Sequence, residues 1–301
     1  MIPLISSICS GPLDVCHLPR FWWKATLRAK GLLDEEYPDL SGGLDTNVLN
    51  TLGLDPDPTL AFIRSEIPSY LTFESWVLEQ KEGSIDRAAT DTWNESVRNR
   101  VHTRPEKLEE TYNDIGWNKD EVSVDSAVVL NSVQDWQLFH KRDVDAGYAA
   151  FGNQVVPLIA TIDYGRLEVC QLPRTWYKIT MRAKGKLHDN YPDMLPNGGL
   201  DKRVIDVLGI SQNRVVSHVR EHLPDFVEFE QFILDECGGE IDRQAADAWN
   251  TEVRDRIHNE AKQTDIHGTL KDYDVGHITS AVVLNQIEDW HFAHQQLTQN
   301  T

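Results

Sequence analysis

Apolar residues recur along the chain with the period of an α-helix. In 85–102, Ala89, Trp93, Val97 and Val101 form one apolar stripe of such a helix. Prolines and capping residues at helix starts, and glycines at helix ends, complete the pattern and predict further helices. These cover 19–30, 45–53, 59–67, 72–81 and 126–140. The only strand-like stretches are IPLISSI (2–8) and VPLIATI (156–162), too little for a sheet core, so the pattern predicts a mainly α protein.

This succession of segments occurs twice. LPRFWWKATLRAKG (18–31) matches LPRTWYKITMRAKG (172–185), and SAVVLNSVQDWQLFH (126–140) matches SAVVLNQIEDWHFAH (280–294). Repeats of this length indicate a duplicated domain rather than a solenoid. We therefore expect two tandem homologous helical domains related by pseudo-two-fold symmetry, either as a monomeric pseudo-dimer or within a homo-oligomer. The predicted boundaries are 1–146 for the first domain, 147–155 for a linker and 156–301 for the second domain.

Composition and charge narrow the class of protein. The chain has 301 residues, of which 40% are hydrophobic and 26% charged, as in an ordinary globular protein. Its formal net charge of -19 opposes binding to nucleic acid and to anionic membranes, so neither is an expected partner. The four cysteines form no CxxC pair, and the N-terminus lacks the pattern of a secretory signal. We expect a cytoplasmic protein with reduced thiols.

Basic residues are retained between the halves more often than acidic ones. Eight aligned pairs account for 16 of the 29 Lys and Arg residues, whereas six pairs account for 12 of the 48 Asp and Glu residues. Arg20, Lys24 and Arg28 lie at i, i+4 and i+8 of one predicted helix, where like charges repel. Either a structural acid offsets them or they bind a carboxylate or phosphate. Their counterparts in the second half are Arg174, Lys178 and Arg182.

A second shared stripe is polar. Arg87, Asp91, Asn94, Arg98 and His102 share one face of the predicted helix 85–102. A buried polar network and a functional site would both explain why these residue types are kept. The predicted catalytic residues are His102, His258, Asp135, Asp289, Asn94 and Asn250. The predicted substrate-binding residues, beyond the basic stripes, are Arg98, Arg254, Trp93 and Trp249.

The leading functional hypothesis is a small-molecule enzyme that binds an anionic substrate. Histidine supplies acid–base chemistry near neutral pH, and the Asp and Asn side chains would orient it. Elimination, isomerisation or cyclisation fits this set, with no metal and no organic cofactor. Two alternatives remain open: a metal-dependent hydrolase or oxygenase using His102, His140 and Asp135, and a non-catalytic binding or scaffold protein.

One further motif bears on the metal alternative. His218 and His222 form an HxxxH pair that could hold a metal on a helix. Their counterparts in the first half are Phe62 and Glu66, which argues against a metal site shared by both halves.

Short motifs suggest a relationship. The run of LPR (18–20), LRAKG (27–31), Tyr37, GGLD (42–45) and LG (52–53) resembles an uncharacterised family of bacterial helical domains. Members of that family carry one such domain, so the tandem arrangement departs from its pattern. The resemblance implies the extent of each domain and no activity.

Overall fold

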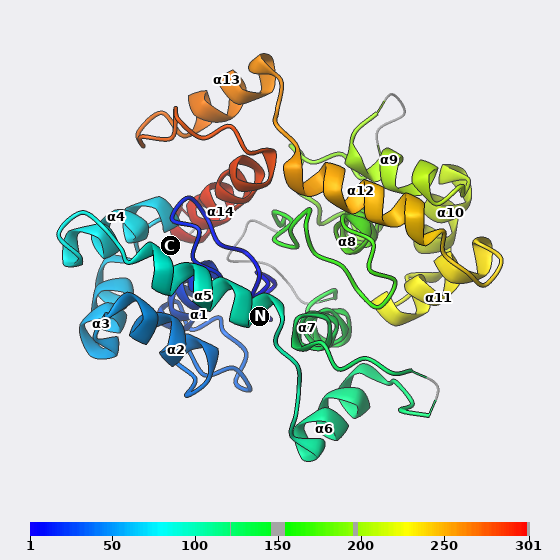
Figure 1. Ribbon diagram of the computed structural model, residues 1–301. Helices are drawn as coiled ribbons and strands as arrows, with labels where there is room; N and C mark the ends of the chain where they lie inside the picture. The colour runs from blue at the N-terminus through cyan, green and yellow to red at the C-terminus, as the bar shows by residue number, and fades with distance from the viewer. Residues whose placement is uncertain (121, 146–153, 195–197, 300–301) are drawn as a thin grey trace. The chain divides into compact units, whose positions relative to one another are not determined.

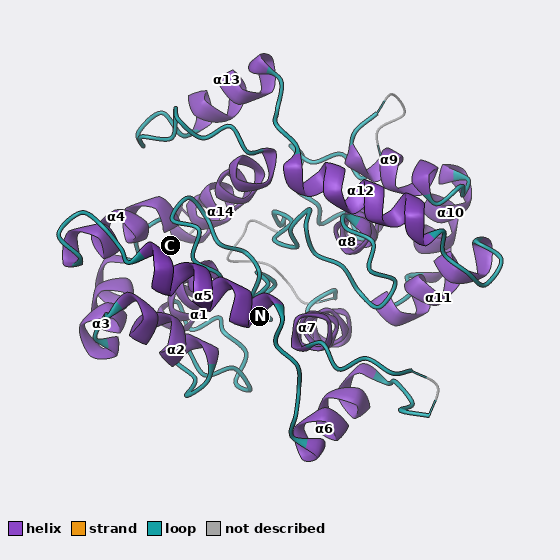
Figure 2. Cartoon of the chain, in the orientation of Figure 1, coloured by secondary structure: helices purple, strands orange, loops and turns teal. Residues whose placement is uncertain are grey.

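The computed structural model describes residues 1–120, 122–145, 154–194 and 198–299. Within these ranges the chain is helical with no β-strand (Figure 2), which confirms the mainly α class. None of the helices described is both long and apolar enough to cross a membrane. Most of the predicted linker, 147–153, lies outside the described residues.

The chain divides into two compact units that combine distant segments. Unit 1 contains Met1–Arg100 and Ile257–His294, and unit 2 contains Val101–Arg256 and Gln295–Thr301. The helices of unit 1 are α1 (Leu18–Ala29), α2 (Leu44–Leu52), α3 (Pro56–Glu66), α4 (Tyr70–Gln80), α5 (Arg87–Arg98), α13 (Glu260–Thr269) and most of α14 (Ala281–Gln299). Those of unit 2 are α6 (Pro105–Ile115), α7 (Ala127–Arg142), α8 (Leu172–Ala183), α9 (Leu200–Val207), α10 (Gln212–His222), α11 (Phe226–Glu236) and α12 (Arg243–Asp255) (Figure 1).

These units differ from the predicted domains 1–146 and 156–301. The first five helices of each half stay together, but the last two helices of each half belong to the other unit. Sequence similarity between the halves identifies the repeated segments, and it carries no information about which copies of them pack together.

Local sequence explains where the helices begin. Pro19 and Pro173 occupy the first turn of α1 and α8, where a missing N–H costs nothing. Asp86 and Asp242 precede α5 and α12, and each carboxylate accepts a bond from a backbone N–H of the first turn. Asp225 forms a reciprocal capping box at the start of α11.

Aromatic side chains of α1, α4 and α14 form the core of unit 1. The ring of Tyr70 packs edge-on against Trp22 and Trp290, with centroid distances of 5.3 and 4.7 Å. Edge-to-face packing suits the aromatic quadrupole and adds to the gain from burial. The last helix of the chain is therefore part of the same core as the first.

Unit 2 has a matching core. Phe226 of α11 packs edge-on against Trp136 of α7 and Trp176 of α8, at 4.6 and 5.4 Å. Phe139 of α7 lies 6.3 Å from the same Trp176 ring. Here α7, from the first half of the sequence, completes a core built from helices of the second half.

Two details of the predicted elements are wrong. The helix predicted over 85–102 ends at Arg98, so His102 lies outside the polar stripe of α5. The backbone N–H of His102 instead bonds to the carbonyl of Asp125, next to an isolated bridge between Val101 and Ser126. The pattern also gave no sign of α6 and α13, which each half inserts before its last helix.

Candidate functional site

The two arginines of the predicted basic stripe of α1 bind the chain's own backbone. The Arg20 guanidinium donates to the carbonyls of Pro3 and Ile5, at 2.7 and 2.9 Å. Arg174 of α8 does the same to Pro157 and Ile159. Both arginines are buried. The strand-like segments 2–8 and 156–162 are therefore loops that an arginine holds against the helix.

Arg28 and Arg182 serve a similar role in the last turn of each helix. Each donates to the backbone carbonyl of a shared tyrosine, Tyr37 or Tyr191, at 2.6 Å. This contact fixes the loop that follows α1 and α8.

We therefore expect Arg28→Ala and Arg182→Ala each to lower the free energy of unfolding by about 1.5–3 kcal/mol, the usual worth of a hydrogen bond with a charged partner. Arg→Lys at the same positions should cost less, because lysine keeps the charge and one donor. Urea denaturation of the full chain measures both. Alanine variants as stable as wild type would contradict a structural role.

Lys24 ends at a buried carboxylate. Its ammonium lies 2.6 Å from Asp45 of α2, and both side chains are almost fully buried. Lys178 pairs with Asp201 of α9 in the same way. The basic stripe had two explanations, a structural acid or a bound anion. For the lysine of each half, the structure contains the structural acid.

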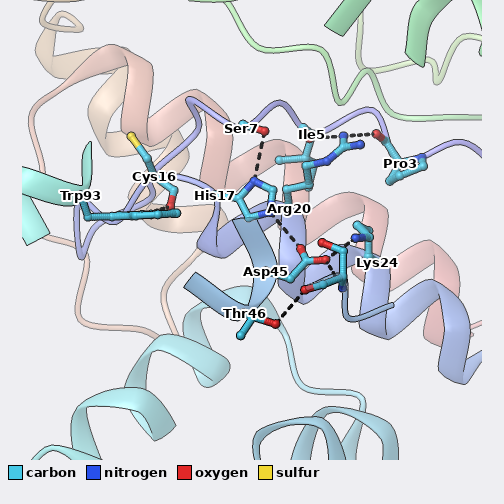
Figure 3. Close-up of polar contacts among 11 residues, drawn as sticks. Pro3, Ile5, Ser7, Cys16, His17, Arg20, Lys24, Asp45, Thr46 and Trp93 are labelled. Atoms are coloured by element: carbon cyan, nitrogen blue, oxygen red, sulfur yellow. Dashed lines mark hydrogen bonds and ion pairs between the residues drawn. The ribbon is translucent and has the colours of Figure 1, made fainter. Parts of the chain in front are cut away.

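Asp45 is also the end of a hydrogen-bonded chain through His17 (Figure 3). Nε2 of His17 lies 2.9 Å from Asp45 Oδ1, and Nδ1 lies 3.1 Å from the hydroxyl of Ser7. Burial lowers the pKa of His17, and Asp45 opposes this shift only in part, so the ring is neutral near pH 7. Burial alone would raise the pKa of Asp45, but His17 and Lys24 outweigh it and lower that pKa. An ionised Asp45 only accepts, so Nε2 carries the ring proton and Nδ1 accepts the Ser7 O–H.

The second half replaces the histidine and the serine of this chain with a glutamine and a threonine and keeps the carboxylate. Gln171 stands where the first half has His17, and it donates to Asp201 Oδ1 at 2.8 Å. Thr161 replaces Ser7, and Thr175 supplies another donor to Asp201 at 2.8 Å. The Ser–His–Asp arrangement is therefore specific to unit 1. Comparison of the halves could not find it, because His17 occurs in only one of them.

The polar stripe of α5 binds the loop that precedes α1. Asn94 accepts from the Cys16 N–H at 2.8 Å and donates to the Asp14 carbonyl at 2.7 Å. The indole of Trp93 donates to the Cys16 carbonyl at 2.8 Å. Arg98 lies 3.8 Å from the Asp14 carboxylate, a weak and exposed contact. These predicted site residues hold one loop in place.

The equivalent residues of α12 repeat the pattern. Asn250 bonds to the N–H of Cys170 and the carbonyl of Glu168, and Trp249 bonds to the Cys170 carbonyl. Arg254 instead lies over the ring of Tyr164, 6.0 Å from its centroid. Burial raises the pKa of both Cys16 and Cys170 to about 11, so neither is a reactive thiolate near neutral pH.

The predicted catalytic set is divided between the units. His102 and Asp135 belong to unit 2, whereas Asn94 belongs to unit 1; His258 and Asp289 belong to unit 1, and Asn250 to unit 2. His102 Nε2 lies 3.0 Å from the side-chain oxygen of Asn131, and His258 Nε2 lies 2.8 Å from that of Asn285. Asp135 and Asp289 are buried. Within each unit, the histidine is joined to the start of the last helix of its own half.

Two buried carboxyls were missed by sequence reasoning. Glu74 accepts from the N–H of Leu13, and Glu230 accepts from those of Arg166 and Leu167. Burial raises the pKa of Glu74 to about 8 and that of Glu230 to about 7, although these hydrogen bonds oppose the shift.

A shared glycine makes room for each carboxyl. A Cβ atom at Gly11 would lie 2.7 Å from Glu74 Oε1, and one at Gly165 would lie 2.5 Å from Glu230 Oε1. The pairs Glu74/Glu230 and Gly11/Gly165 are identical between the halves, which was the signal available in the sequence.

These carboxyls predict a pH-dependent stability. A folded-state pKa above the unfolded value stabilises the fold at low pH, and that contribution is lost as the pH rises through the folded pKa. Between about pH 5 and pH 7–8 each of these carboxyls is protonated in the folded protein and ionised in the unfolded chain. We therefore expect the free energy of unfolding to fall by about 1.4 kcal/mol per pH unit for each carboxyl. Glu74→Gln and Glu230→Gln keep an acceptor and should flatten the curve. Parallel curves for wild type and variants across pH 5–9 would contradict the assignment.

The remaining shared histidines connect helices within a unit. His140 Nε2 lies 2.9 Å from the carbonyl of Leu223 in unit 2, and His294 Nε2 lies 2.7 Å from that of Ile67 in unit 1. Among the described residues there is no group of three or more His, Cys, Asp or Glu side chains placed to hold a metal. The metal alternative based on His102, His140 and Asp135 therefore has no three-ligand site in the described part of the chain.

Unit 2 also contains a pocket of about 650 Å³, which we call the α10–α11 pocket. It is lined by Gly116, Trp117, Asn118, Val122, Arg166, His218, His222, Pro224, Val227, Glu228, Gln231, Phe232 and Asp235. The His218 ring stacks on Phe232 at 3.7 Å. Burial, with His222 nearby, lowers the pKa of His218, so this ring is neutral near pH 7. The pocket thus combines aromatic walls with a few polar groups, as small-molecule sites do.

Comparisons with protein-family models, with curated proteins and with solved structures found no match to this chain.

Proposed function

We propose that the protein is a non-catalytic binding protein built from two copies of one helical domain. The observation that carries this proposal is the use of the shared polar side chains. Arg20, Lys24, Arg28, Trp93 and Asn94 all engage backbone or buried groups of unit 1, and their counterparts do the same in unit 2. Residues retained for scaffolding explain the similarity of the halves without a shared active site. Duplication and pseudo-two-fold symmetry belong to the same proposal.

The α10–α11 pocket is the proposed ligand site. Its described lining carries two carboxylates, Glu228 and Asp235, and one guanidinium, which Arg166 directs to Gln231 at 2.7 Å. With His218 neutral and a chain charge of -19, this balance favours a ligand that carries a positive charge. Trp117 and the stacked pair of His218 and Phe232 supply the surface for a ring. A small aromatic amine meets both requirements, whereas the anionic ligand predicted from the basic stripe does not.

Calorimetric titration tests the pocket with two probes that share a ring and differ in charge. Tryptamine should bind, indole-3-acetate should not, and Asp235→Asn should weaken tryptamine binding severalfold. Glu79→Gln is the matched control, because Glu79 aligns with Asp235 in the other half. Preferential binding of indole-3-acetate would instead support the anionic ligand, and binding of neither probe would contradict the pocket's assignment.

A second candidate, acyl transfer, is favoured by the Ser7–His17–Asp45 chain. In this candidate the Ser7 oxygen attacks an ester carbonyl, His17 Nδ1 takes the hydroxyl proton, and the same proton passes to the leaving alcohol. Asp45 keeps the ring in the required tautomer. Water then attacks the acyl-serine, with His17 again as the base, and releases the acid.

A fluorophosphonate probe separates this candidate from the binding protein. Acyl transfer requires labelling of Ser7 by the probe, with loss of fluoride and loss of labelling in Ser7→Ala. His17→Gln copies the second half of the chain and should also abolish labelling while keeping the bond to Asp45. No labelling of wild type would leave only a structural role for the chain. The enzyme predicted from His102, Asp135 and their counterparts stays a prediction.

A further inference from the structure

The last helix of each half is fixed in its unit by the same two side chains. Trp136 and His140 of α7 contact Phe226 and the Leu223 carbonyl in unit 2. In unit 1, α14 places Trp290 against Tyr70 and His294 against the Ile67 carbonyl. Each histidine ring also lies 6.3 Å from a tryptophan ring. For His140 this is Trp176 of α8, and for His294 it is Trp22 of α1.

The acceptor carbonyls have a distinctive backbone. Ile67 and Leu223 follow α3 and α10 in the left-handed region, with φ of 45° and 48°. A non-glycine residue in this conformation is uncommon, and its carbonyl lies at a helix C-terminus that favours a hydrogen-bond donor. Each imidazole therefore bonds to the C-terminal carbonyl of a helix and also packs in the aromatic core. These two contacts make the docking of α7 and α14 specific.

None of these contacts requires that the docked helix follow its acceptor closely in sequence. Ile67 and His294 are 227 residues apart, and Ser69, which caps α4, bonds to Tyr273 across a similar separation. Such an element can be supplied equally by another copy of the chain, which is the basis of domain swapping. Within one chain, the tether gives α14 a high effective concentration at this surface.

We propose that the surface of unit 1 formed by Trp22, Ile67 and Tyr70 also receives α13 and α14 of a second copy of the chain. Reciprocal exchange then gives a dimer in which every helix has the contacts of the monomer. The exchange occurs when chains refold together at high concentration, because a folded monomer already occupies the surface with its own α14.

Two differently tagged wild-type samples, refolded together from denaturant at high concentration, test the exchange. We expect co-capture through either tag and a particle of twice 34.3 kDa by light scattering. Mixing the same samples already folded should give no co-capture. Absence of co-capture after refolding, at any concentration at which the chain stays soluble, would overturn the proposal.

Co-refolding of two complementary variants tests whether the pairing depends on α14. Trp290→Glu disables α14, and Tyr70→Glu disables its acceptor, so neither variant can close unit 1 alone. Co-refolding the two should form a heterodimer with one intact unit 1, whereas two tagged copies of Trp290→Glu should not pair. Equal pairing in both mixtures would show association that does not depend on the helix, and it would overturn the proposal even if either variant folds poorly.

Discussion

Replacement of Asp201 by alanine should lower the free energy of unfolding by about 3–5 kcal/mol, the cost of leaving a buried charge without its partner. The Lys178 ammonium would lose its partner, and Gln171 and Thr175 would lose their acceptor. Asp45→Ala should have an effect of the same size, because it strands Lys24 beside His17. Equilibrium denaturation of the full chain by urea measures both.

Asp39→Ala and Asp193→Ala provide the matched control. These carboxylates pair with Arg64 and Arg220, whose side chains are about half exposed. Surface ion pairs contribute about 0–1 kcal/mol, so the controls should be nearly as stable as wild type. If all four variants were equally stable, the buried pairs would not be part of the scaffold, and an anion-binding role for Lys24 and Lys178 would regain support.

A chain cut within 147–153 should remain a single particle of 34.3 kDa in native mass spectrometry, while a denaturing gel separates two fragments. The reason is that each fragment supplies helices to both units. The N-terminal fragment contains α6 and α7 of unit 2, and the C-terminal fragment contains α13 and α14 of unit 1. An inserted protease site allows the cut to be made after folding.

The two fragments should separate only when α7 and α14 lose the contacts that hold each of them in the unit formed mainly by the other fragment. The double variant Trp136→Glu, Trp290→Glu removes the aromatic contact of both, so its fragments should separate after the same cut. If the wild-type fragments separated under native conditions, each half would be a complete domain, as the boundaries 1–146 and 156–301 predicted.

Helix positions could be predicted because their signals are local. The stretch from Pro19 to Gly31 shows its start, its end and its apolar face within a dozen residues, and α1 follows it closely. The predicted end of α5 was wrong because Val101 continues the apolar period beyond the helix. Val101 lies in an extended segment, where it makes a bridge to Ser126. Periodicity records which face is apolar, and a residue just beyond a helix can fit the same period by chance.

The packing of α7 in unit 2 and of α14 in unit 1 could not be predicted from the sequence, for a physical reason. The sequences SAVVLN and DW, with the final His, are identical at 126–140 and 280–294, so the sequence does not show which acceptor surface takes which helix. The basic stripe was ambiguous for a related reason. The partners of its two arginines are backbone carbonyls such as those of Pro3 and Tyr37, and a sequence does not show where a carbonyl points.

Unit 1 cannot close until the last helix of the chain has left the ribosome. About 190 residues separate Arg100 from His294, which at about 5–20 residues per second is a delay of roughly 10–40 s. During that time the rings of Trp22 and Tyr70 lack the helix that covers them in the finished protein. The helices of unit 2 from α6 to α12 have no such delay, because α7 is made before the helices that receive it, and only Gln295–Thr301 of that unit come later. The nascent chain should therefore complete its second unit first, and the waiting aromatic surface of the first is where we expect a chaperone to bind.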